Sequence, residues 1–141
     1  MTTEDQIGAY IATQEVAKQA ELQALHSQIL HMFPQCKVWF NDGKDNSGKV
    51  VSNPSIGYGA YTIRYANGTS KEFFRVGISG NKSGLSVYIM GLADKKHLEN
   101  AMGSSIGKAT VSGYCIKFKS VKDINLDVLY SEIKYRMSLP N

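Results

Sequence analysis

The sequence lacks any apolar run that approaches the roughly 20 residues needed to cross a bilayer. Its first residues, MTTEDQ, are polar and acidic, unlike a secretory signal, so we predict a cytoplasmic protein that makes no use of a membrane. Cysteine is scarce, and Cys36 and Cys115 are expected to be free thiols in that compartment. No dense run of Lys and Arg accompanies the net charge of +4, so nucleic acid is not an expected partner.

What is present is enough for one folded unit. Of the 141 residues, 43% are hydrophobic and 20% are charged, which is ordinary for a globular protein. A chain of this length buries an adequate core without disulfides or metal. No internal repeat or low-complexity tract divides it, so we predict a single domain over residues 1–141.

Helical spacing of apolar residues predicts two helices near the start, over 4–12 and 14–33. Thr3 and Gln6 have the spacing of a capping box, which places the first helix start near that point. Pro34 ends the second helix, because the residue before a proline disfavours the helical conformation. The two predicted helices therefore precede all of the strands.

The middle of the chain has the period-two alternation of strands. It predicts four of them, over 61–66, 73–78, 85–90 and 114–119. The first three are expected to form an antiparallel meander, because Asn67-Gly68 is a strong hairpin signal and 80–84 is rich in turn formers. For the polar segment 41–52, a hairpin and a mobile loop fit equally well.

Helices return after the strands. Asp94 is expected to cap a short helix that Gly103 ends, and either Asp123 or Asn125 to cap a last helix with apolar residues at three-four spacing. The pattern predicts an α+β fold, in which the N-terminal and C-terminal helices cover one face of a mostly antiparallel sheet. Alternation assigns the following side chains to the covered face: Tyr61, Ile63, Tyr65, Phe74, Val76, Ile78, Leu85, Val87, Ile89, Tyr114, Ile116 and Phe118.

Several segments resemble the YdhG-like domains of unknown function. They are 54–59 (Pro-Ser-Ile-Gly-Tyr-Gly), 77–79 (Gly-Ile-Ser), 85–89 (Leu-Ser-Val-Tyr-Ile) and 123–126 (Asp-Ile-Asn-Leu). The resemblance covers roughly residues 20 to 135 and implies an α+β fold, in agreement with the pattern of elements. Some relatives in that family are described as frataxin-like iron chaperones, so the resemblance also implies iron handling as an alternative function.

Three local patterns resemble catalytic motifs and fail on spacing or context. Segment 103–110 has three residues between its glycines where a phosphate-binding loop needs four, and Ala109 stands where that loop needs Ser or Thr. Ser79 and Lys82 have Ser-x-x-Lys spacing, but in a predicted turn instead of a helix. Cys115 is in mid-strand with no base assigned to it. No catalytic residue is predicted, which favours a binding protein over an enzyme of unrecognised type.

Metal-binding patterns are equally sparse. Iron sites require clustered carboxylates or imidazoles. His26 and His31 are five residues apart, roughly 140° around a helix, so they cannot chelate one ion from a regular helix. We predict no metal ligand and no cofactor.

One predicted surface has a composition that suggests binding. By alternation, the uncovered face of the sheet carries cations beside aromatic residues, which suits an anionic or planar ligand. We expect Arg64, Arg75 and Tyr88 at its centre, Lys82 in the adjacent turn and Lys117 on the last strand. The alternative is an ordinary solvated face without a ligand. The sequence thus suggests a small binding domain for an anionic small molecule or a protein partner.

Overall fold

The computed structural model describes residues 1–141 and has an α+β fold, as the sequence predicts. The elements follow in the order α1 (Thr3–Ala12), α2 (Val16–Met32), β1 (Val38–Asn41), β2 (Ser55–Tyr58), β3 (Tyr61–Arg64), β4 (Ser70–Phe73), β5 (Val76–Asn81), β6 (Gly84–Ile89), α3 (His97–Met102), β7 (Thr110–Val111), β8 (Cys115–Phe118), a 3-10 turn η1 (Val121–Asp123) and α4 (Leu126–Ser138). None of the helices combines the length and the apolarity that a membrane span requires.

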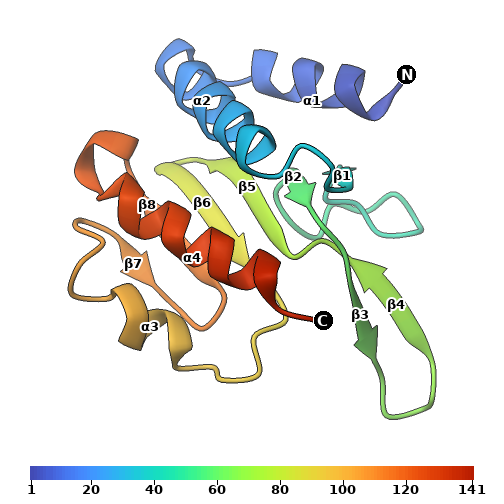
Figure 1. Ribbon diagram of the computed structural model, residues 1–141. Coiled ribbons are helices and arrows are strands. Elements are labelled where there is room, and N and C mark those ends of the chain that lie inside the picture. The colour runs from blue at the N-terminus through green and yellow to red at the C-terminus, as the bar shows by residue number, and fades with distance from the viewer.

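The strands form two separate sheets. The main sheet has six strands in the order β1-β2-β5-β6-β8-β7, and every neighbouring pair is antiparallel. Strands β3 and β4 pair only with each other, and Figure 1 shows this hairpin extending away from the main sheet. Strands β5 and β6 are therefore the two central strands of the main sheet.

The predicted three-stranded meander is wrong. The turn at Asn67-Gly68 does form, and Gly68 has the positive φ that it requires. Its second strand, however, is 70–73, and the chain then leaves the hairpin before it enters the main sheet. The partner of β5 on that side is β2, whose sequence Ser-Ile-Gly-Tyr shows no alternation that identifies a strand.

One face of the main sheet packs against the helices. Buried side chains of α1, α2 and α4 form a single core cluster with the strand residues that point toward them. Seven of the residues assigned to this face belong to the cluster: Val76, Ile78, Leu85, Val87, Ile89, Ile116 and Phe118. Figure 1 shows α2 and α4 crossing the sheet, and both contact β5. Burial of these side chains, at about 1.5–3 kcal/mol each, is the principal stabilising term.

The other assigned residues lie elsewhere. Tyr61, Ile63 and Tyr65 belong to the separate hairpin, and Tyr114 is exposed before β8 begins. Phe74 is buried, but on the opposite face of the main sheet, where it lies against the paired glycines of β2 and β5. Alternation gives the correct face for the long central strands and fails where the chain passes between the two sheets.

The helix ends differ slightly from those predicted. Thr2, not Thr3, caps α1, and it forms a capping box with Asp5. Asn125 caps α4 by accepting hydrogen bonds from two amides of its first turn, whereas Asp123 lies in the preceding 3-10 turn. Contrary to the prediction, Asp94 does not cap α3: Lys96 occupies the cap position without a side-chain hydrogen bond, and Asp94 accepts a hydrogen bond from Lys96 N at 2.9 Å in the preceding turn.

The polar segment 41–52 is ordered as a hairpin-like loop. An isolated antiparallel bridge joins Lys44 to Val50 and closes a tight turn between them. Within that turn the Asp45 carboxylate accepts hydrogen bonds from Ser47 N at 2.9 Å and Lys49 N at 3.0 Å. Of the two predicted alternatives, the structure has the hairpin.

Candidate functional site

The five residues predicted to bind a ligand do not share one surface. Arg64 is exposed at the end of β3, in the separate hairpin. Tyr88 and Lys117 lie on β6 and β8 of the main sheet, on the face away from the helices, and Lys82 lies in the β5–β6 turn. The predicted single face is therefore wrong, because it assumed that the strand carrying Arg64 belongs to the main sheet.

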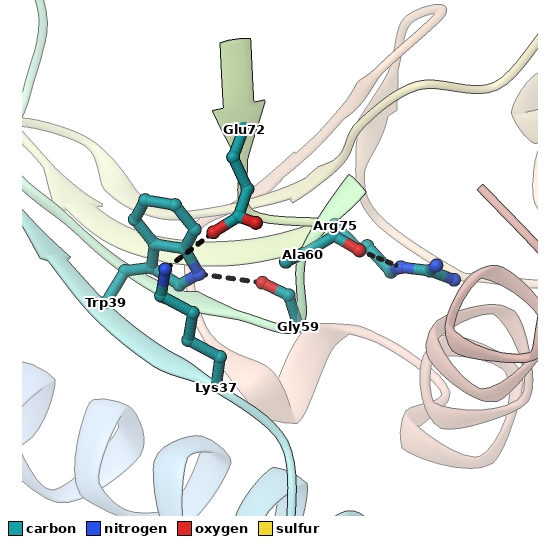
Figure 2. A network of polar contacts seen from close by, with 6 residues as sticks. All are labelled: Lys37, Trp39, Gly59, Ala60, Glu72 and Arg75. Atoms are coloured by element: carbon teal, nitrogen blue, oxygen red, sulfur yellow. Dashed lines mark hydrogen bonds and ion pairs between the residues drawn. The ribbon is translucent and has the colours of Figure 1, made fainter. Parts of the chain in front are cut away.

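Arg75 lies between the two sheets, and its guanidinium is already occupied by backbone carbonyls. Its acceptors are Ala60 O at 2.6 Å, Met137 O at 3.4 Å, Pro140 O at 3.3 Å and Leu139 O. Figure 2 shows the bond to Ala60, where the chain turns from β2 into β3. In this arrangement Arg75 joins the start of the hairpin to the segment that follows α4.

A second network in Figure 2 joins the hairpin to β1. Trp39 Nε1 donates a hydrogen bond to Gly59 O at 2.7 Å. Lys37 Nζ lies 4.0 Å from the centroid of the Trp39 ring and forms an ion pair with Glu72 at 2.6 Å. The lysine thus stacks on an aromatic ring and pairs with a carboxylate at once, so its charge is neutralised locally.

Tyr88 lines a small hollow on the face away from the helices. The hollow has a volume of about 250 Å³, and its lining combines four aromatic residues with Met90 and four polar residues: Phe73, Phe74, Tyr88, Tyr114, Met90, Asn41, Ser52, Asn53 and Ser55. Beside it, burial raises the pKa of the Tyr88 hydroxyl and of the Cys115 thiol, so both groups are neutral near pH 7. This chemistry suits contact with an apolar or planar group and supplies no nucleophile.

Another hollow, of about 630 Å³, lies between α1 and the β5–β6 turn. Tyr10, Phe40 and Pro54 form part of its wall, and Lys82 lies at its margin. The Tyr10 hydroxyl accepts a hydrogen bond from Gly80 N at 2.8 Å, which fixes the helix against the strand. Lys82 thus lines the hollow on the α1 side of the turn, whereas Lys117 lines a different one.

Lys117 lies in a groove on the other side of that turn. We call it the basic groove, and its residues are Asn81, Ser83, Lys108, Ala109, Thr110, Lys117, Phe118 and Lys119. Its volume is about 550 Å³. Three ammonium groups line it, together with the Thr110 hydroxyl, and no carboxylate does.

Strand pairing places the three lysines close together. Thr110 of β7 is directly opposite Lys117 of β8. Lys119 follows Lys117 by two residues, and Lys108 lies in the bend before β7; both line the groove together with that pair. Like charges that line one groove repel each other, so an anion bound among them is favoured.

The three ion pairs of the molecule lie elsewhere. The ion pairs are Lys37–Glu72, Lys96–Glu99 and His97–Glu132, and none involves a lysine of the basic groove. Glu21, which lies near the end of β8, accepts hydrogen bonds from Val121 N at 2.5 Å and from Ser120 Oγ. The three lysines thus keep their charges available to a ligand.

Sequence reasoning identified only one lysine of this groove as a site residue. Lys108 stands in a glycine-rich connection without strand alternation, so no local pattern marks it. It is brought to the groove by the pairing of β7 with β8, which the sequence pattern does not specify.

The structure contains no group of three or more His, Cys, Asp or Glu side chains arranged to hold a metal ion. His26 is buried and shares a hydrogen bond with the Tyr58 hydroxyl at 2.6 Å. His97 pairs with Glu132 and stacks on Tyr135. Both histidines are therefore engaged in contacts that hold helices in place.

Comparisons of the chain with models of protein families, with curated proteins and with solved structures find no match. The resemblance to YdhG-like domains, with the iron handling that it implies, stays a prediction. The function of the chain is therefore inferred from its geometry.

Proposed function

We propose that this chain is a non-enzymatic binding domain that holds an anionic small molecule in the basic groove. The observation that carries the proposal is the set of three lysines that line the groove without any carboxylate. An anion placed between Lys108, Lys117 and Lys119 removes their mutual repulsion and gains several charge-assisted hydrogen bonds. The Thr110 hydroxyl adds a neutral donor.

The exposure of these lysines sets the scale of the affinity. Exposed charge pairs contribute about 0.2–1 kcal/mol each, so the groove fits a ligand with two or more negative charges better than one with a single charge. A dissociation constant on the order of 1 mM or somewhat tighter is expected at low ionic strength. A phosphorylated metabolite has the required charge and fits the volume of the groove.

Inorganic pyrophosphate is a suitable probe, with binding measured by isothermal titration calorimetry at low ionic strength. We expect the double variant Lys117→Gln/Lys119→Gln to bind pyrophosphate about tenfold more weakly than the unsubstituted protein, because each lost lysine removes up to about 1 kcal/mol. Binding should also weaken as salt is added, since the Debye length falls from about 30 Å at 0.01 M to about 8 Å at 0.15 M.

The matched control is Lys44→Gln/Lys49→Gln, which removes the same charge from the exposed 41–52 loop. It should leave pyrophosphate binding nearly unchanged. An equal loss in both double variants would mean that only the net charge matters, and the proposal would then be wrong. Absence of binding to the unsubstituted protein would also reject it.

Iron handling receives no support from the donor set. The candidate carboxylates and imidazoles are dispersed, and His26, His97 and Glu132 already have partners. We therefore do not extend the proposal to iron.

A further inference from the structure

Arg136 is a buried cation without a carboxylate partner. Its side chain lies on α4, has no exposed surface and is among the largest fully buried side chains of the molecule. Its Nε donates a hydrogen bond to Met90 O, but no protein atom accepts from Nη1 or Nη2. An unpaired charge in a protein interior is strongly unfavourable, so such groups are normally paired or bound to a ligand.

The surroundings disfavour the positive charge of Arg136. Burial, and then the neighbouring positive charge of Arg75, lower the pKa of Arg136. Glu132, one helical turn earlier on α4, is paired with His97. Two guanidinium groups thus lie near each other at the junction of the two sheets, and neither has an ion-pair partner.

The buried guanidinium is covered by one aromatic ring and by the backbone. The Tyr61 ring centroid, on β3, lies 5.0 Å from Arg136 Cζ, a cation–π contact. On another side is Gly91, where a Cβ would lie 2.9 Å from Nη2 and 2.6 Å from Tyr61 Cε2. Gly91 also has a φ of +77°, so a residue without a side chain is needed at this position for two reasons.

We propose that Nη1 and Nη2 of Arg136 form a binding site for an oxyanion, a carboxylate or a phosphate, beneath Tyr61. The two free donors of a guanidinium form the planar fork that binds two oxygens of such a group at once. This site is separate from the basic groove, and it does not depend on the function proposed there.

Movement of the β3–β4 hairpin gives an anion access to Arg136. Tyr61 is only half-buried, and its strand pairs with β4 alone. Besides the contact of Tyr61 with Arg136, the hairpin is held by an exposed ion pair between Lys37 and Glu72, by the edge contact of Trp39 with Phe73, and by the hydrogen bonds that Thr62 exchanges with Asn141 near the C-terminus. Displacement of Tyr61 with the hairpin therefore exposes Arg136 without disturbing the main sheet.

The test is the dependence of thermal unfolding on acetate and, separately, on inorganic phosphate, each replacing chloride at constant ionic strength. We expect the Tm of the unsubstituted protein to rise by roughly 5 °C or more at an anion concentration about 100 times the dissociation constant. The acetate and phosphate arms decide which oxyanion fits. In the acetate arm the variant Lys117→Gln/Lys119→Gln should retain the rise, because a single negative charge gains little in the basic groove, and this separates the two sites.

Two substitutions of Arg136 test whether the rise in Tm needs its charge and its planar pair of donors. Arg136→Met keeps much of the length without the charge, so it should fold at least as stably in chloride and lose the anion-dependent rise. Arg136→Lys keeps a charge without the fork, so its rise should be several-fold smaller. An unchanged rise in Arg136→Met, or no rise in the unsubstituted protein, overturns the proposal.

A direct readout on the unsubstituted protein makes the test independent of how the variants fold. The side-chain Nη protons of Arg136 should shift in NMR spectra as acetate or phosphate is added. If they do not shift at an anion concentration that raises the Tm, the anion binds elsewhere and the inference is wrong.

Discussion

A pair of glycines at the centre of the main sheet determines where Phe74 lies. Gly57 of β2 is directly opposite Gly77 of β5, on the face away from the helices. A Cβ at Gly57 would lie 2.4 Å from Phe74 Cδ2, and a Cβ at Gly77 would lie 2.6 Å from Phe74 Cε1. The absence of both side chains therefore allows the phenylalanine ring to lie flat on the sheet and close part of that face.

We expect Gly77→Ala to lower the free energy of unfolding by about 1–3 kcal/mol, because its methyl group overlaps the Phe74 ring. Phe74→Ala alone should cost about 3–5 kcal/mol through the cavity that it leaves. In the double variant the methyl group enters that space, so the combined cost should be less than the sum. Chemical denaturation of the four proteins measures this coupling.

Gly8→Ala is the control for the glycine substitution itself. Gly8 lies in α1, and a Cβ there meets no atom within 4 Å, so this change should stabilise the protein by about 0.5–1 kcal/mol. Strictly additive costs at Gly77 and Phe74 would show that the two positions do not contact each other in solution.

The residue patterns correctly predict which faces of the long helices and strands are buried. They do not predict which residues come together in the candidate sites. Leu129, Ile133 and Arg136 follow one another at helical spacing, so the pattern itself places an arginine on the buried stripe of α4. The predicted ligand-binding residues, however, lie on the predicted strands and in the turn between two of them. The lack of a partner for Arg136, in contrast, depends on contacts between distant segments that no local pattern specifies.

At the scale of elements, the two short strands β2 and β4 account for most of the difference between prediction and structure. Strand β4 is Ser-Lys-Glu-Phe and mostly exposed, so it has no apolar alternation. Strand β2 is fully buried on both sides, but its glycine and the preceding proline are typical of a loop. Each of the two segments is a strand because of its pairing with a neighbouring strand, and its own residue pattern does not indicate one.

The β3–β4 hairpin should open independently of the main sheet. Its ion pair to Lys37 is about half exposed on both sides, and such pairs contribute roughly 0–1 kcal/mol. Native-state hydrogen exchange should therefore show Ile63 and Lys71 exchanging through local opening, with little dependence on low denaturant. Amides of Ile78 and Val87 should exchange only through global unfolding.

Glu72→Gln provides the matched comparison, because it removes the ion pair and keeps the shape of the side chain. Exchange in the hairpin should then accelerate by at most about fivefold, the equivalent of roughly 1 kcal/mol. Equal protection of the hairpin and the central strands would contradict this view of the hairpin, and with it the proposed route to Arg136.

For the whole molecule, one buried histidine links the helical layer to the sheet. His26 of α2 bonds to the Tyr58 hydroxyl of β2, and both residues are buried. Burial lowers the pKa of His26, and the negative charge of Glu4 opposes that shift without cancelling it. The folded protein therefore holds this imidazole in its neutral form more firmly than the unfolded chain does.

The stability of the molecule should follow from that difference. In the unfolded chain the histidine binds its proton near pH 6.5, whereas the folded state binds it only at lower pH. Between these two pKa values the unfolded state holds more protons, so the free energy of unfolding falls as the pH is lowered below about 6.5 and has its full value above it. Urea denaturation at a series of pH values measures the slope.

His26→Asn keeps a polar atom near Nδ1 and cannot titrate, so it should flatten the slope in this window. His31→Asn, at the exposed end of the same helix, is the control and should leave the slope as it is. If the slope survives in His26→Asn, another group governs the acid response.

The lysines beside β7 also protect the protein against aggregation. Strand β7 is an edge of the main sheet and offers only two residues for pairing with a foreign strand. A second copy that approached this edge would bring its own Lys108 against the same lysine, so edge-to-edge association is disfavoured both by charge and by the short length of the strand. The ammonium groups that we propose to hold an anion should thus also oppose aggregation.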